Sequence, residues 1–320
     1  MYPFVYRRIL VGLLGLFMLV LVAGATYQWV ATRHELTSTP PPGQLVDVGG
    51  HRLHLWCTGA GTPVVILEAG LGGSSAGWGS VQPEIARFTR VCSYDRAGMG
   101  YSDRGPSPRT ARRIAGELAG LIDRSGMAVP VVLVAASLGG FDVRVFASDH
   151  TDRVAGLVLI DASHEDQAHD VPGLARWVPL LSSLGILRLL GISFGLDPAI
   201  LSPSDRRFAA ATRFRAAGYQ AAADEIMHIQ ASASEVRSSR RKLSIPVVVV
   251  TGGRGADATW RRLQRDQVTL SDRGCQVVAE QSGHLVQIDQ PEIVVDAIRS
   301  IINATRRGDG PDCGSGAAVR

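Results

Sequence analysis

The chain has 320 residues, of which 46% are hydrophobic and 19% charged, and its formal net charge is +4. This composition excludes an intrinsically disordered protein, and the length allows one large core or two modest ones. Arginines are scattered beside acidic residues and form no basic stripe with interleaved aromatics, so nucleic-acid binding is not expected.

A hydrophobic segment occupies the first 36 residues. Arg7 and Arg8 precede an apolar run over 9–22 that continues more weakly to Val30. This length is just enough for a helix across a bilayer, which needs about 20 residues, and the leading arginines place the remaining chain outside the cytoplasm. The small residues at 23–25 also fit a cleaved signal peptide. We expect a membrane anchor, with secretion after cleavage as the alternative.

Next come a Pro-rich linker at 37–44 and a folded domain expected over 45–303. Short apolar runs alternate there with segments of helical periodicity. The predicted strands are 45–48, 51–57, 64–68, 90–94, 131–134, 154–160, 247–251 and 276–280; the predicted helices include 83–88, 111–124, 138–148 and 291–302. An opening hairpin followed by this alternation predicts the α/β class, with a mostly parallel sheet flanked by helices.

Residues 163–243 interrupt the alternation. They lack strand-like runs and contain helical stretches at 175–190, 206–218 and 222–240. An insertion at the sheet edge where ligands bind predicts a helical lid. Its apolar residues would either line an acyl pocket or pack the lid onto the core, and packing is the favoured role. The tail at 304–320 is Gly-rich, and we expect it to be disordered.

Ser137 is the candidate nucleophile. It follows the apolar run 131–134 and precedes Gly139 and Gly140, as at the tip of a tight strand-to-helix turn that exposes a serine hydroxyl. Ala135 stands where the usual Gly-x-Ser-x-Gly pattern has its first glycine, and alanine is the smallest substitute. This segment predicts a serine hydrolase.

A serine nucleophile needs a base and an acid that orients the base. His284 follows the last predicted strand after Gly283 and is the expected base. Two aspartates compete for the role of acid: Asp257 follows the strand at 247–251, and Asp161 ends the strand at 154–160. We favour Asp257, with Asp161 as the alternative and Glu165 as a distant third. The competing role for Asp257 is to cap a following helix.

Backbone N–H groups would form the oxyanion hole. One donor is Leu138, directly after the nucleophile. The other is Leu71, in the Gly/Ser-rich loop that follows the strand at 64–68, where Gly70 lets the backbone turn inward. Asp95 and Arg96 are expected to form a structural ion pair or turn, with a substrate contact by Arg96 as the alternative. No metal or organic cofactor is implied.

Four segments together resemble the α/β-hydrolase superfamily: Glu68–Ser75, Tyr94–Asp103, Ala136–Gly140 and Ser282–His284. With Asp161–Asp166 and the N-terminal hydrophobic segment, the chain is similar to bacterial membrane-anchored α/β hydrolases. The resemblance covers about 43–303 and implies a Ser-acid-His triad. It also explains why both aspartates stay open, because the acid in most esterase relatives follows the strand equivalent to 247–251, whereas in dehalogenase relatives it ends the strand equivalent to 154–160. A serine nucleophile argues against the dehalogenase and epoxide hydrolase branches.

The expected activity is cleavage of small or medium carboxylic esters, with lipidic esters as one class, through an acyl-enzyme. An acyltransferase with the same triad and an inactive binding scaffold are the alternatives.

The four cysteines are too few for a disulfide scaffold. Cys57 and Cys92 lie near strand ends, as either a disulfide or two buried thiols, and Cys275 and Cys313 have no evident partner.

Overall fold

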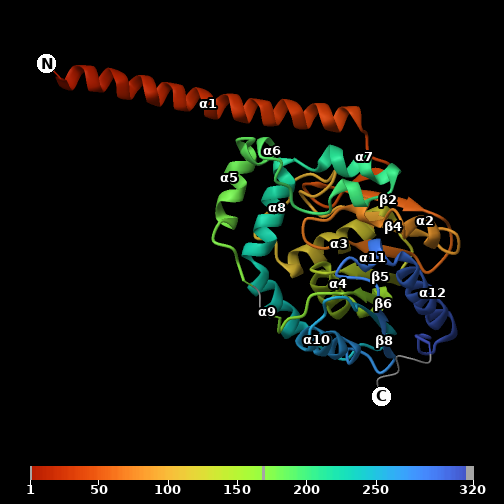
Figure 1. Cartoon of the computed structure of the whole chain (residues 1–320). Coiled ribbons are helices and arrows are strands. Elements are labelled where there is room, and N and C mark those ends of the chain that lie inside the picture. The colour runs from red at the N-terminus through yellow and green to blue at the C-terminus, as the bar shows by residue number, and fades with distance from the viewer. Residues whose placement is uncertain (1, 168–169, 315–320) are drawn as a thin grey trace.

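A computed structural model describes residues 2–167 and 170–314. Within them, eight strands form one sheet in the order β1-β2-β4-β3-β5-β6-β7-β8. Figure 1 shows this sheet with helices packed around it. The strands are β1 (Gln44–Asp47), β2 (Arg52–Thr58), β3 (Val65–Glu68), β4 (Val91–Tyr94), β5 (Val131–Ala136), β6 (Val154–Ile160), β7 (Val247–Gly252) and β8 (Gly274–Ala279). β2 pairs antiparallel with β1 and β4, and the other pairings are parallel. The mostly parallel sheet is confirmed.

Helices cover both faces of the sheet because its central strands are apolar on both sides. Along β5, Val131, Leu133 and Ala135 face one core cluster, and the alternate residues face the other. The helices α3 (Ala111–Ser125), α4 (Gly139–Asp149) and α10 (Ala258–Val268) contribute to the first cluster. The second is covered by α2 (Gln82–Ile85), α11 (Val286–Asp289) and α12 (Pro291–Arg307).

Among the described residues between β6 and β7, the region predicted as a lid, five α-helices are found: α5 (Val178–Ser183), α6 (Ile186–Leu189), α7 (Pro203–Thr212), α8 (Ala216–Met227) and α9 (Ile229–Ser239). The predicted helical stretches are broken where the chain turns. Gly185, with a φ of +72°, separates α5 from α6. Composition identified the helical insertion, but the turns depend on how its helices pack.

The N-terminal helix α1 (Tyr2–Ser38) runs through most of the segment predicted as anchor and linker, so the linker begins only at Thr39. Its N-terminal half projects away from the rest of the molecule, and its C-terminal half lies against the lid helices (Figure 1). Within the described residues, α1 is the one helix whose length and apolar composition would allow it to cross a membrane.

Two disulfides join all four cysteines. Cys57 and Cys92 face each other across β2 and β4, which decides between the two alternatives left open for this pair. Cys275 pairs with Cys313, so the expectation that these two have no partner is wrong. Cys275 and Cys313 lie far apart in sequence, and only the fold brings the segment after α12 beside β8. Helix α12 also extends to Arg307, into the expected disordered tail. Residues 315–320 of that tail lie outside the described residues.

Candidate active site

Three side chains form a chain of hydrogen bonds at the carboxyl ends of the parallel strands. His284 Nε2 lies 2.8 Å from Ser137 Oγ, and His284 Nδ1 lies 2.6 Å from Asp161 Oδ2. Ser137 follows β5, Asp161 follows β6, and His284 lies between β8 and α11. The geometry therefore brings Ser137 and His284 together as the sequence predicts, and it supplies Asp161 as the carboxylate.

The backbone is strained at two of these positions. Ser137 has a φ of +51° and Asp161 a φ of +41°, and they are the two non-glycine residues with positive φ within the described chain. Such conformations cost about 1–3 kcal/mol each and cluster at functional sites. Gly139 is required beside the serine, because a Cβ there would lie 2.5 Å from the carbonyl oxygen of Ala69. The tight turn therefore needs a glycine at position 139, on the helix side of Ser137. On the strand side of Ser137, alanine is accommodated at position 135 within β5.

The favoured acid, Asp257, does not contact His284 among the described interactions, and that expectation is corrected. Its Oδ1 accepts a hydrogen bond of 2.7 Å from the backbone N–H of Trp260, so it is the N-cap of α10. Asp161 instead accepts from the indole Nε1 of Trp260 at 2.8 Å and from the backbone N–H of Gly252 at 3.0 Å. Both bonds go to Oδ1, which leaves Oδ2 for His284. Sequence reasoning missed Trp260, since nothing in a lone tryptophan indicates its partner.

The loop after β3 passes directly over the serine. A Cβ at Gly70 would lie 2.9 Å from the Cβ of Ser137, so only glycine allows this approach. The guanidinium of Arg96 binds the carbonyl oxygens of Ala69 and Gly70, the latter at 2.8 Å. A trans peptide points its C=O and N–H in opposite directions. Fixing the Gly70 carbonyl therefore also fixes the direction of the Leu71 N–H.

Arg96 is buried and binds carboxylates rather than facing the cavity. Glu68 lies 2.6 Å from its Nη1, and Glu225 of helix α8 lies 3.0 Å from its Nε. Burial by itself disfavours the charged guanidinium, but Glu225 and Glu68 outweigh burial and raise the pKa of Arg96 well above its usual range. Asp95 pairs with His54 at 2.8 Å, and no Asp95–Arg96 ion pair is found among the described contacts. Arg96 instead begins a turn, the other expected role, in which its carbonyl accepts from the Met99 N–H at 2.9 Å. Arg96 thus links the lid to the loop over Ser137.

A cavity of about 560 Å³ opens onto Ser137 and His284. Its walls include Gly70 and Leu71 from the loop after β3, and Gly195 and Leu196 from the lid. Trp177 and Leu180, two apolar residues of the predicted lid, are about half exposed and are not among the residues that line this cavity. The sequence analysis did not identify Leu196 as a cavity residue, because the sequence around a single leucine between helices does not indicate where its side chain points.

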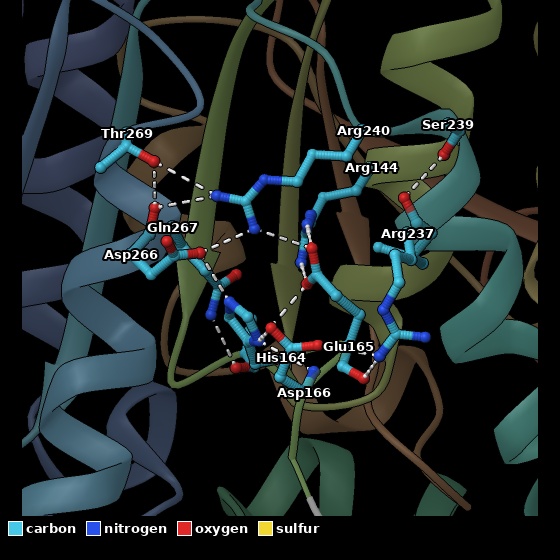
Figure 2. A network of polar contacts seen from close by, with 12 residues as sticks. Arg144, His164, Glu165, Asp166, Arg237, Ser239, Arg240, Asp266, Gln267 and Thr269 are labelled. Carbon is cyan, nitrogen blue, oxygen red and sulfur yellow. Dashed lines mark hydrogen bonds and ion pairs between the residues drawn. The ribbon is translucent and has the colours of Figure 1, made fainter.

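A second polar cluster holds the start of the lid (Figure 2). Glu165, the third candidate acid, binds Arg144 through two hydrogen bonds of 2.7 and 2.8 Å and binds Arg240 of the lid at 2.8 Å. His164 Nε2 lies 2.7 Å from Asp266 of α10. These residues tie the segment after Asp161 to α4, to the end of α9 and to α10, and none of them contacts Ser137 or His284 in the described interactions.

Comparison with known proteins identifies the family of this chain. The family model described as "Alpha/beta hydrolase family" matches residues 64–297. The chain belongs to this family. It is also similar to an AB hydrolase superfamily protein of Gibberella zeae, with 25% identity over an alignment covering 76% of this chain and 87% of that protein. Matches to two other fungal proteins are partial and cover 18% and 22% of their lengths.

Two solved structures share the alpha/beta hydrolase fold. A thermophilic esterase from Thermogutta terrifontis has a TM-score of 0.64 and 24% identity, over 83% of this chain and 99% of that one. The enol-lactonase from Burkholderia xenovorans has a TM-score of 0.63 and 19% identity, over 81% of this chain and 100% of that one. At these identities the likeness concerns the fold, and the chemistry has to be argued from the site.

Proposed function

We propose that this alpha/beta hydrolase cleaves carboxylic esters with Ser137 as nucleophile, His284 as base and Asp161 as the orienting acid. The observation that carries the proposal is the continuous pair of hydrogen bonds, 2.8 and 2.6 Å long, from serine to histidine to carboxylate. The positive φ at both Ser137 and Asp161 supports it, because strain of this kind is retained where function requires it.

In the first half-reaction, His284 Nε2 takes the proton of Ser137 Oγ as the oxygen attacks the ester carbonyl. The N–H groups of Leu71 and Leu138 are the proposed donors to the oxyanion. Leu138 precedes α4, where the first N–H groups have no partner within the helix. His284 then gives its proton to the departing alcohol, and an acyl-enzyme remains. Asp161 holds the imidazole and stabilises its positive charge.

In the second half-reaction, water attacks the acyl-enzyme with His284 again as base, and the acid leaves. An alcohol acceptor in place of water would make the protein an acyltransferase. Product analysis with added alcohols separates these two outcomes. The cavity of about 560 Å³ suits a small or medium acyl ester.

The test is labelling of the solubilised full chain with a fluorophosphonate probe, which reacts with activated serines. We expect the wild type to label, Ser137→Ala to abolish labelling and His284→Ala to reduce it sharply. Ser74→Ala is the matched control, because Ser74 lines the same cavity without contacting His284. A folded wild type that does not label indicates a binding scaffold instead.

We also propose that α1 is a membrane anchor and that the hydrolase domain lies outside the cytoplasm. Two observations support an anchor over a cleaved signal. Helix α1 continues unbroken through the small residues at 23–25, and Gly24 lies against the backbone of Leu184 in the lid. The two disulfides support an oxidising compartment.

A further inference from the structure

Helix α1 is fixed to the lid at a defined point along its length. Gln28 is 4% exposed; its amide donates to the carbonyl of Phe214 at 2.6 Å and accepts from Arg188 at 2.9 Å. Arg188 in turn binds both carboxylate oxygens of Glu35. Since Arg188 belongs to α6, these contacts join the second half of α1 to the α5–α6 part of the lid (Figure 1).

The register of α1 places this junction at a membrane boundary. About 20 helical residues, rising 1.5 Å each, span the roughly 30 Å hydrocarbon core of a bilayer. Counting from Ile9, directly after Arg7 and Arg8, such a span ends at Gln28. The first lid contacts, at Gly24 and Gln28, therefore coincide with the outer end of the span.

One segment of the lid beside this junction, residues 171–196, is rich in apolar residues and lacks acidic ones. Residues 171–196 contain no Asp, Glu or Lys, and their charged residues are Arg176 and Arg188. The large apolar side chains of this segment that expose more than two fifths of their surface include Leu174, Trp177, Leu180, Leu189, Leu190 and Ile192. Large exposed apolar side chains concentrated in one segment indicate a membrane or protein contact, and the absence of acidic residues from this segment suits anionic headgroups.

We infer that residues 171–196 form a second membrane contact, in which the lid rests in the headgroup region and inserts its exposed leucines and Trp177 into the bilayer surface. The inference rests on the proposed anchoring by α1. The same segment ends at Gly195 and Leu196, which line the cavity at Ser137. The lid thus connects the bilayer surface to the site, and an ester dissolved in the membrane is the substrate class that this arrangement would serve.

The test uses the full chain in phosphatidylcholine–phosphatidylglycerol vesicles and a polarity-sensitive fluorophore on one introduced cysteine. Native thiols do not interfere, because all four native cysteines are paired. Leu190→Cys reports on the lid and Leu14→Cys on the anchor. Val278→Cys is the matched control, an exposed apolar residue on the edge strand β8, on the far side of the molecule from α1 (Figure 1).

We expect the Leu190 and Leu14 labels to be quenched by doxyl lipids and shielded from iodide, and the Val278 label to behave in the opposite way. A Leu190 label that iodide quenches as well as it quenches Val278, with Leu14 still in lipid, overturns the lid contact and leaves the anchor standing. A Leu190 label shielded from both quenchers also overturns it, because a second protein copy would then cover the patch. If Leu14 is not in lipid, the anchor itself fails.

Discussion

At the residue scale, two aspartates with similar positions in the sequence make different contacts. Both follow a parallel strand and so lie at the same sheet edge. Asp161 takes a positive φ, which Asp tolerates better than most residues, and its carboxylate reaches His284. Asp257 lies five residues after β7, at the start of α10, where its carboxylate binds the N–H of Trp260. The backbone conformation at each position decides which carboxylate reaches the histidine.

Asn substitutions separate these roles. Asp161→Asn removes the negative charge that orients His284, and we expect kcat to fall by about 10⁴, as for loss of this charge in other triads. Asp257→Asn keeps a good N-cap residue, so activity and stability are expected to stay close to wild type. Ester hydrolysis and thermal unfolding of both variants provide the measurement. A larger loss of activity in Asp257→Asn than in Asp161→Asn contradicts the assignment.

Trp260 is expected to position the acid. Trp260→Phe removes the 2.8 Å hydrogen bond to Asp161 Oδ1 while keeping an aromatic ring beside His284. Because the bond acts on the carboxylate rather than on substrate, kcat is expected to fall by about tenfold, the equivalent of roughly 1.4 kcal/mol, with KM nearly unchanged. Steady-state kinetics on a soluble ester tests this. A rise in KM with unchanged kcat would assign Trp260 to substrate binding instead.

At the element scale, buried charges rather than apolar packing alone join the lid to the sheet. Arg96 links Glu225 of α8 to the loop over Ser137, and Glu165 links the start of the lid to Arg144 of α4 and to Arg240. A buried charge that loses its partner is costly, so these links hold the elements in one arrangement. The lid therefore meets the edge of the sheet that carries Ser137 in a defined geometry.

The Glu165 cluster predicts a dependence of stability on acid pH. Burial alone would favour the protonated acid, but the hydrogen bond and charge of Arg144 outweigh it and lower the pKa of Glu165 below its usual 4.5. The unfolded chain therefore binds this proton at higher pH than the folded one. The stabilisation is present above about pH 4.5 and is lost as pH falls through the folded-state value.

We expect Glu165→Gln to be less stable than wild type at pH 7 and to approach it between about pH 5 and 3. Urea unfolding across this range gives the measurement. Asp272→Asn is the control, because the Asp272 side chain is 86% exposed and pairs only at the surface with Lys242. If the free energies of unfolding of wild type and Glu165→Gln fall in parallel as the pH is lowered, this carboxylate does not contribute to the loss of stability in acid.

At the scale of the whole molecule, one sheet, one helical insertion and one N-terminal helix produce a site bounded by segments far apart in sequence. The segments after β3, β5, β6 and β8 contribute the loop over Ser137, then Ser137, Asp161 and His284. The C-terminal segment after α12 is joined back to β8 by the Cys275–Cys313 disulfide. This bond closes a long loop that contains α11 and α12, the helices beneath the histidine loop.

Removing that disulfide is expected to destabilise the domain as a whole. The two cysteines are 38 residues apart, and loop-closure entropy predicts a loss of at most about 4 kcal/mol. Cys275→Ser with Cys313→Ser should therefore lower the urea midpoint, and reduction of the wild type should shift it in the same direction. An unchanged midpoint in the double variant would mean that the bridge is not formed in the protein or does not constrain the unfolded chain.

The amino-acid sequence by itself determined the fold class, and it indicated Ser137, His284 and the helical insertion. Period-two and helical apolar patterns, and small residues at a strand-to-helix turn, are local signals that survive in a single chain. The tertiary structure alone decided which aspartate faces His284, that Trp260 and Arg96 hold the site, and that Cys275 meets Cys313. Each depends on the direction of a side chain toward a partner far away in sequence. That direction follows from how the elements pack, and composition and spacing do not encode it.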